Sequence, residues 1–364
     1  MLHINSSEAP IEQSFCHPLI SRKTSIVYGT ILLIIKILIN VIGITGNALV
    51  VRVYIKKHDK HPSEYLILAL GSIDFFFCVS SLVFMSGIFL SNLFPEMKQS
   101  GFCVMSCAAN SSAYTFASFS SCYLIFVMTI NRYVAICMPH DYKVVFSQRI
   151  VISVLYGCFL FGSINALPPI FYCYGDVELQ YKIDFYWYSA KCFIILITCI
   201  AMIFVYTRVV FKFSGRRDSS KKPELAISTR LHSINGTLPV EESCLSGAAT
   251  PQIQCILEKH NQTWKSRGRR QHKVTITLFT VSILFILSTI PHVTLETAAW
   301  YKEAVMKTDH KPIQIGNDMA YMAFLVYFDL NPIIYFVTNS YFRRETSKFF
   351  RSMLHCWRET PYYL

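Results

Sequence analysis

Seven long apolar segments constrain this 364-residue chain more than any other feature of its sequence. An apolar run of about 20 residues suits an α-helix that crosses the hydrocarbon core of a bilayer. A closed β-barrel also satisfies every backbone hydrogen bond in lipid. Its strands, however, alternate apolar and polar residues over about 10 residues, which does not match such continuous apolar runs. The predicted spans are Ile26–Val51, Tyr65–Leu90, Cys103–Ile136, Ile150–Phe171, Phe185–Phe211, Lys273–Ala299 and Ile315–Val337. The sequence therefore predicts an all-α membrane protein with a seven-helix bundle.

An eighth segment has a different pattern. Apolar residues at Tyr341, Phe342, Phe349, Phe350 and Met353 alternate with basic ones at Arg343, Arg344, Lys348 and Arg351. This pattern predicts a short amphipathic helix that lies in the plane of the lipid headgroups. The chain is thus divided into an extracellular segment (1–25), the seven-helix domain (26–338), and the amphipathic helix with a cytoplasmic tail (339–364).

The basic residues set the expected orientation. The chain has 34 Lys and Arg against 22 Asp and Glu, and thirteen of the basic residues lie between Arg208 and Lys273. Cytoplasmic loops carry an excess of Lys and Arg, so we expect the amino terminus outside and the carboxyl terminus inside. The net charge of +12 is then explained by topology and anionic lipid, and no nucleic-acid partner is expected. We expect the polar loop at about 212–272 to be disordered.

Other classes of membrane protein find little support. No internal repeat is visible, which disfavours transporters built from duplicated halves. No nucleophile–base pair, phosphate-binding loop or set of metal ligands is visible either, so we expect no enzyme activity and no cofactor beyond a bound sodium ion discussed below.

Polar residues within the apolar segments carry the most specific signal, because such groups are costly in lipid and usually functional. The relevant motifs are Gly46-Asn47-Ala48-Leu49-Val50, Leu68-Ala69-Leu70-Gly71-Ser72-Ile73-Asp74, Asn131-Arg132-Tyr133, Phe285 six residues before Pro291, and Asn331-Pro332-Ile333-Ile334-Tyr335 followed by Phe342. In order and spacing they closely resemble the signatures of rhodopsin-like G-protein-coupled receptors, across the whole membrane domain.

The resemblance implies a receptor at the plasma membrane that binds an extracellular ligand and activates a heterotrimeric G protein, with arrestin and a receptor kinase as further partners. Arg132 would contact the G protein when the sixth helix swings outward; the alternative is an arginine that only reaches towards the headgroups. The residues implied in coupling and activation are Asn131, Arg132, Tyr133, Tyr206, Pro291, Asn331, Pro332 and Tyr335.

Several residues depart from the family pattern. Asn131 replaces the acidic residue whose charge restrains the arginine in the resting state, and Gln271 replaces a glutamate of the sixth helix. We therefore expect high basal signalling. Thr289 replaces the tryptophan that precedes the sixth-helix proline. These losses keep open an alternative function, a seven-helix binding or scavenger receptor that does not couple.

A buried polar cluster is expected around Asp74. Asn47, Ser121 and Asn331 occupy positions that resemble the sodium and water cluster of the family. The alternative is a protonated Asp74 with hydrogen bonds between helices.

The resemblance places the ligand among the outer halves of the third, fifth, sixth and seventh helices. Candidate ligand-binding residues are Tyr114, Thr115, Ser118, His292, Glu296, Asn317 and Tyr321. Tyr114 stands where amine receptors have aspartate and Leu325 where opsins have the retinal lysine, so neither a monoamine nor covalent retinal is expected. Lys36 and Lys191 could face the same region and favour a peptide or an anionic small molecule; alternatively they reach towards the headgroups.

The expected extracellular modifications complete these assignments. The resemblance pairs Cys107 with Cys173 in a disulfide, whereas Cys16 and Cys103 either form a second bond or stay free. Asn5 begins an Asn-Ser-Ser sequon and is the expected glycosylation site.

Overall fold

A computed structural model describes residues 26–94, 101–168, 177–219, 274–298, 301 and 311–359 of the chain. Within these ranges the regular structure is helical, with no β-strand. Seven helices are long and apolar enough to cross a membrane: Thr30–Ile55, Pro62–Gly87, Ala108–Cys137, Gln148–Asn165, Ser189–Lys212, Val274–Ala298 and Met319–Thr338. The predicted fold class is confirmed.

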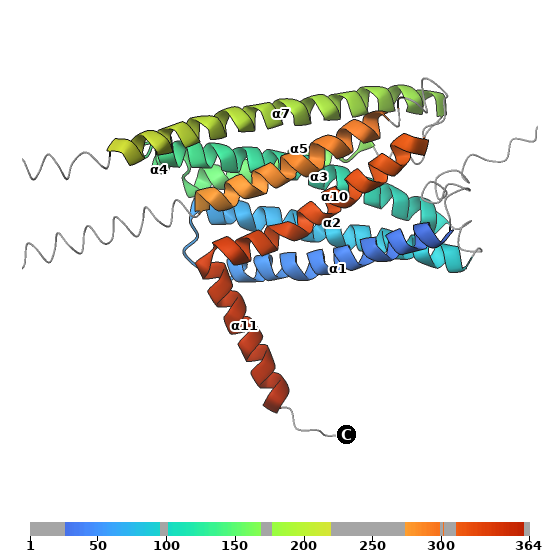
Figure 1. Ribbon diagram of the computed structural model, residues 1–364, viewed down its shortest axis with the longest axis horizontal. Coiled ribbons are helices and arrows are strands. Elements are labelled where there is room, and N and C mark those ends of the chain that lie inside the picture. Colours follow the sequence, from blue (N-terminus) through green and yellow to red (C-terminus); the bar gives the residue numbers. More distant parts are fainter. Residues whose placement is uncertain are drawn as a thin grey trace, which may run out of the picture.

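Six labelled helices contain six of these spans, and all of them except α5 extend beyond the span that they contain. They are α1 (Ile26–Ile55), α2 (Pro62–Leu93), α3 (Gly101–Cys137), α5 (Gln148–Asn165), α7 (Val177–Ser219) and α10 (Lys311–Thr338). The sixth span, Val274–Ala298, is the unlabelled orange helix of Figure 1. A short helix that the sequence did not predict, α4 (Tyr142–Val145), follows α3.

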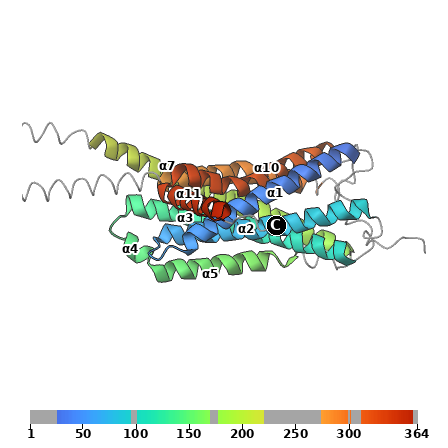
Figure 2. The same cartoon turned by 90° about the horizontal axis from the view of Figure 1, so that it is seen from below.

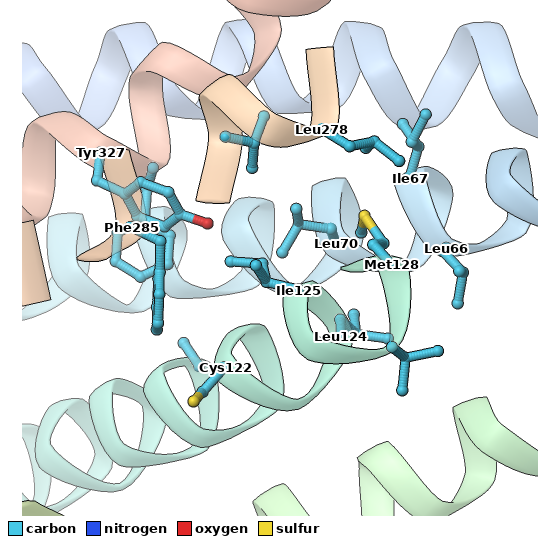
Figure 3. Packing of buried hydrophobic residues seen from close by; sticks show 14 of the residues in the cluster. Leu66, Ile67, Leu70, Cys122, Leu124, Ile125, Met128, Leu278, Phe285 and Tyr327 are labelled. Atoms are coloured by element: carbon cyan, nitrogen blue, oxygen red, sulfur yellow. The ribbon is translucent and has the colours of Figure 1, made fainter. Parts of the chain in front are cut away.

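The helices form one bundle, with α3 contacting α2, α5 and α7, and α1 contacting α2 and α10 (Figure 1). Figure 2 shows α5 on the outside of this bundle. The interior is apolar: Leu70, Met128, Leu278 and Phe285 are almost fully buried and come from three different helices, which are α2, α3 and Val274–Ala298 (Figure 3). Apolar side chains such as Phe204 on α7 are exposed, as expected for a surface that faces lipid.

Two helices end at residues other than those predicted from the sequence. The fourth span ends at Asn165 rather than Phe171. Helix α7 continues to Ser219, so the first residues of the loop expected to be disordered are helical. The remainder of that loop, residues 220–273, lies outside the described residues.

The predicted eighth helix is present as α11 (Ser340–Glu359), which projects away from the bundle (Figure 1). Asn339 caps it, because its Oδ1 accepts hydrogen bonds from the backbone N–H of Tyr341 at 3.0 Å and of Phe342 at 3.3 Å. The Asn339 amide also donates to the Tyr54 hydroxyl at 2.7 Å, and Phe342 stacks on the Tyr54 ring. The angle between α10 and α11 is therefore held by contacts with α1.

Apolar side chains are exposed on α11, among them Phe350, Met353 and Leu354. Along the same helix, Glu345 lies 3.0 Å from the Lys348 ammonium. Lys348, with Arg344 beside it, holds the pKa of the Glu345 carboxyl below its ordinary value. Exposed apolar residues next to fixed charges match the pattern expected at a membrane surface.

Candidate functional site

Polar residues within the bundle gather in three places along its length. One group surrounds Arg132 at the end of α3 that leads to α4, and a second surrounds Asp74 in the middle. The third surrounds Tyr114 near the opposite end of α3. We call the two ends of the bundle the Arg132 end and the Tyr114 end.

Arg132 is buried, with 3% of its surface exposed. One of its terminal nitrogens, Nη2, donates to the Oγ of Ser63 on α2 and to the Oδ1 of Asn131 at 2.6 Å. Ser63 in turn donates to Asn131 Oδ1 at 2.9 Å. Within the described part of the chain no carboxylate pairs with Arg132, so neutral oxygens hold the guanidinium.

Two aromatic residues support this arrangement. The Asn131 amide donates to the Tyr142 hydroxyl at 3.2 Å, and the Tyr142 ring stacks on His61 with centroids 5.6 Å apart. His61 directly precedes α2, and its backbone N–H donates to the Glu64 carboxylate at 2.9 Å. This first turn of α2 places Ser63 beside Arg132. We call these five residues (His61, Ser63, Asn131, Arg132 and Tyr142) the Arg132 network.

Three further residues of the predicted coupling set are tyrosines. Tyr206 of α7 is 3.1 Å from Ser282 of the Val274–Ala298 helix, hydroxyl to hydroxyl. Tyr335 is fully buried, and its hydroxyl has no hydrogen-bond partner among the described residues. Tyr133 is half-buried and packs against the apolar core. The Tyr206 hydroxyl therefore links two helices, whereas the Tyr335 hydroxyl makes no hydrogen bond to another described residue.

The two prolines of the predicted coupling set lie in different surroundings. Pro291 is exposed within the Val274–Ala298 helix. Pro332 lies inside α10 and packs closely against Gly46 of α1, where an added Cβ would be 2.9 Å from the proline Cγ. Glycine thus permits close packing of α1 and α10 beside the predicted polar cluster.

That polar cluster forms around Asp74. Asn331 donates to Asp74 Oδ2 at 2.8 Å, and Asn47 donates to the carbonyl of Phe328 at 3.0 Å. Both asparagines, Asp74 and Ser121 are fully buried. Four oxygens of these side chains have no hydrogen-bond partner among the described residues: Asp74 Oδ1, Asn47 Oδ1, Ser121 Oγ and Asn331 Oδ1. An all-oxygen set of this kind fits a hard cation such as sodium, and the Asn331–Asp74 bond also matches the alternative of direct bonds between helices.

A second carboxylate, Asp329, lies between α10, α1 and α2. It is buried on α10, close to Gly43 of α1, and its Oδ1 is 4.0 Å from the Cys78 thiol. No group of three or more His, Cys, Asp or Glu residues in the described ranges could hold a metal ion.

At the Tyr114 end an ion pair joins two helices. The Lys191 ammonium of α7 lies 2.7 Å from Glu296 Oε2 of the Val274–Ala298 helix. It also donates to the Tyr114 hydroxyl of α3 at 3.2 Å. Lys191 is 2% exposed and Lys36 3% exposed, and the Lys36 ammonium lies over the Tyr321 ring. Both lysines therefore point into the bundle, not towards the headgroups.

The predicted ligand-binding residues are only partly brought together. Tyr114, His292 and Tyr321 form an aromatic group with ring centroids 5.4 to 6.3 Å apart, next to Glu296. Thr115 and Ser118 instead donate to backbone carbonyls of their own helix at 2.9 and 2.8 Å. The side chain of Asn317 lies outside the described part of the chain.

Other predicted positions also lie outside the described residues. They are Asn5, Cys16, Cys173 and Gln271, together with the side chains of Cys103 and Cys107. The disulfide and glycosylation assignments remain predictions.

Sequence reasoning missed the partners of Arg132. Ser63 lies 69 residues from Arg132 in the chain, and neither His61 nor Tyr142 belongs to a motif of the sequence analysis. One signal was present: His61-Pro62-Ser63-Glu64 is a helix-start pattern, which places Ser63 in the first turn of α2.

Comparison with known proteins agrees with this arrangement. Residues 46–335 match the family described as "7 transmembrane receptor (rhodopsin family)". The chain is 23% identical to 5-hydroxytryptamine receptor 7 of Xenopus laevis over 344 residues, covering 91% of this chain and 77% of that protein. It is 30% identical to human olfactory receptor 5AK2 over 145 residues, 38% of this chain and 43% of that receptor. The matched residues include the Arg132 network, the Asp74 cluster and the Lys191–Glu296 pair. Because the match covers most of the chain, the protein belongs to the rhodopsin family of seven-transmembrane receptors.

Proposed function

We propose that this receptor converts the binding of an extracellular ligand at the Tyr114 end into activation of a heterotrimeric G protein at the Arg132 end. The observation that carries the proposal is a buried arginine whose hydrogen-bond acceptors within the described ranges are neutral oxygens. It lies at one end of a bundle that has a polar, aromatic group near the other end. The clustering of basic residues at the Arg132 end supports placing that end in the cytoplasm.

We propose that the Val274–Ala298 helix is the element that moves on activation. It is attached to α7 twice, by the Lys191–Glu296 ion pair at the Tyr114 end and by the Tyr206–Ser282 hydrogen bond nearer Arg132. A ligand that binds one arrangement of these contacts more tightly shifts the population towards it. Outward movement of this helix would open the surface around Arg132 to a G protein.

We infer high basal activity from the chemistry of the Arg132 network. Hydrogen bonds from a guanidinium to a carboxylate are stronger than those to a neutral amide or hydroxyl. With Asn131 and Ser63 as acceptors, the resting arrangement is held less firmly than a charge pair would hold it.

The ligand that fits best is a peptide or a small molecule, with anionic groups favoured by Lys36. Tyr114 in place of an aspartate argues against a monoamine of the kind that amine receptors bind. The alternative function, a seven-helix binding or scavenger receptor that does not couple, is favoured by Asn131 and Thr289. Arrestin and a receptor kinase are proposed as further partners, and sodium as an ion held at Asp74.

The decisive experiment measures G-protein nucleotide exchange in membranes that contain this receptor, without added ligand. Exchange that disappears in Arg132→Ala at equal surface expression supports coupling. If exchange stays at background, high basal activity is wrong. A screen of peptides and organic acids then separates a ligand-dependent receptor from a binding protein that does not couple.

A further inference from the structure

The ammonium group of Lys191 is held by side chains from two other helices. Glu296 Oε2 lies 2.7 Å from it and the Tyr114 hydroxyl 3.2 Å from it. The same nitrogen is 4.5 Å from the centroid of the Tyr114 ring. The site thus supplies a carboxylate, a hydroxyl and an aromatic ring to one nitrogen that is almost completely buried.

These are the groups that recognise an alkylammonium ion. A buried ammonium needs a close counter-ion to offset its lost hydration, and an aromatic ring adds electrostatic attraction. Amine receptors have an aspartate where this chain has Tyr114. Here Glu296 of the Val274–Ala298 helix supplies the carboxylate instead. The Tyr114 end therefore retains a place for a cation, although Tyr114 itself is neutral.

We propose that Glu296 and Tyr114 form a primary-alkylammonium site and that Lys191 occupies it as a built-in cationic ligand. Lys191 is covalently attached beside the site, so its effective concentration is in the millimolar range or above. A free amine must displace it. The intact receptor should therefore not respond to small amines, even though the groups that bind them are present.

Glu296 is the accessible member of the pair. Its side chain is 21% exposed, whereas that of Lys191 is 2% exposed. A free amine that approaches the pair meets the carboxylate, and the place for its nitrogen is filled by Lys191. Removal of the lysine side chain beyond Cβ would leave Glu296 facing a gap of three methylenes and one ammonium.

The test is chemical rescue of Lys191→Ala by n-propylammonium, which has the atoms that the substitution removes. The thermal midpoint of the purified full-length receptor is measured with and without the amine. We expect Lys191→Ala to melt several degrees below the unsubstituted receptor. Millimolar n-propylammonium should raise its midpoint in a saturable way and leave the unsubstituted receptor unchanged.

Three controls separate a site from a general effect of salt or solvent. Lys191→Met fills the gap with an uncharged chain, and the double variant Lys191→Ala with Glu296→Gln removes the anion. Neither should respond to the amine. Propionate, which has the opposite charge, should not rescue Lys191→Ala.

The proposal is supported if n-propylammonium stabilises Lys191→Ala and none of the other variants. Absence of rescue, or an equal shift in the unsubstituted receptor, overturns it. If Lys191→Ala cannot be purified, Lys191→Ser leaves the same gap with a hydroxyl that can solvate Glu296, and the same outcomes apply. The measurement reports binding alone, so its failure and a failure of G-protein coupling are distinguishable.

Discussion

At the scale of single residues, the acceptors of Arg132 decide how firmly the resting state is held. Asn131→Asp would place a carboxylate where the Asn131 Oδ1 now accepts a hydrogen bond at 2.6 Å. Replacement of a neutral acceptor by a charged one favours the resting arrangement by about 1–2 kcal/mol. We expect agonist-free nucleotide exchange to fall roughly 5- to 30-fold, measured in membranes at equal receptor density.

Asn131→Gln is the matched control, because it keeps an amide and adds no charge. If Gln lowers basal exchange as much as Asp does, charge is not the cause and the explanation of basal activity is wrong.

A second residue-scale prediction concerns Gly46. Its substitution by alanine brings a Cβ to 2.9 Å from the Pro332 Cγ, a rigid ring that cannot swing aside. Overpacking of this kind typically costs about 1–3 kcal/mol, so the thermal midpoint of purified Gly46→Ala should fall. Gly316→Ala is the control, since its Cβ would lie 3.6 Å from the nearest Leu295 atom. Equal midpoints for the two variants would contradict close packing of α1 against α10.

At the scale of elements, Asn339 defines where α10 ends and α11 begins. Asn339→Ala removes the cap of α11 and the bond to Tyr54. Loss of a cap costs about 1 kcal/mol, so amide hydrogens in the first turns of α11 should exchange several-fold faster. Hydrogen exchange with mass spectrometry measures this. Asn339→Asp keeps the acceptor for the backbone N–H groups and should stay near the original rate; fast exchange there would show that capping is not the stabilising contact.

At the scale of the whole molecule, the Asp74 cluster contains residues from four helices: Asn47 of α1, Asp74 of α2, Ser121 of α3 and Asn331 of α10. A sodium ion bound to their free oxygens would stabilise the folded bundle by mass action. We expect the thermal midpoint to rise in sodium chloride relative to choline chloride at the same ionic strength. Asp74→Asn should abolish this difference, whereas a sodium effect that persists in it would place the ion elsewhere.

The architecture could be predicted from the sequence because span length and apolarity are local properties. Each segment must satisfy its backbone within itself in lipid, so seven long apolar runs predict seven helices without knowledge of their neighbours. The amphipathic pattern after Tyr341 predicted α11 for a similar reason. The end of the fourth span was less predictable, since apolar residues continue past Asn165 without continuing the helix.

The partners of the polar residues could be predicted only in part. The motifs indicated Asp74 and Asn331 together, and they bond at 2.8 Å. Lys191 and Glu296 were both candidates for the Tyr114 end, but nothing in the sequence paired them. For Arg132 the departure at Asn131 was visible, whereas its bond to Ser63 was not.

The chain's sequence determined that seven helices cross the membrane and which polar residues lie within them. Only the tertiary structure decided which of those residues meet, because a hydrogen bond between helices depends on how each helix is rotated and how far it is shifted along its neighbour. Ser63 and Arg132 are 69 residues apart in the chain, and Lys191 and Glu296 are 105 apart. Contacts at such separations follow from packing of whole helices, which no local pattern specifies.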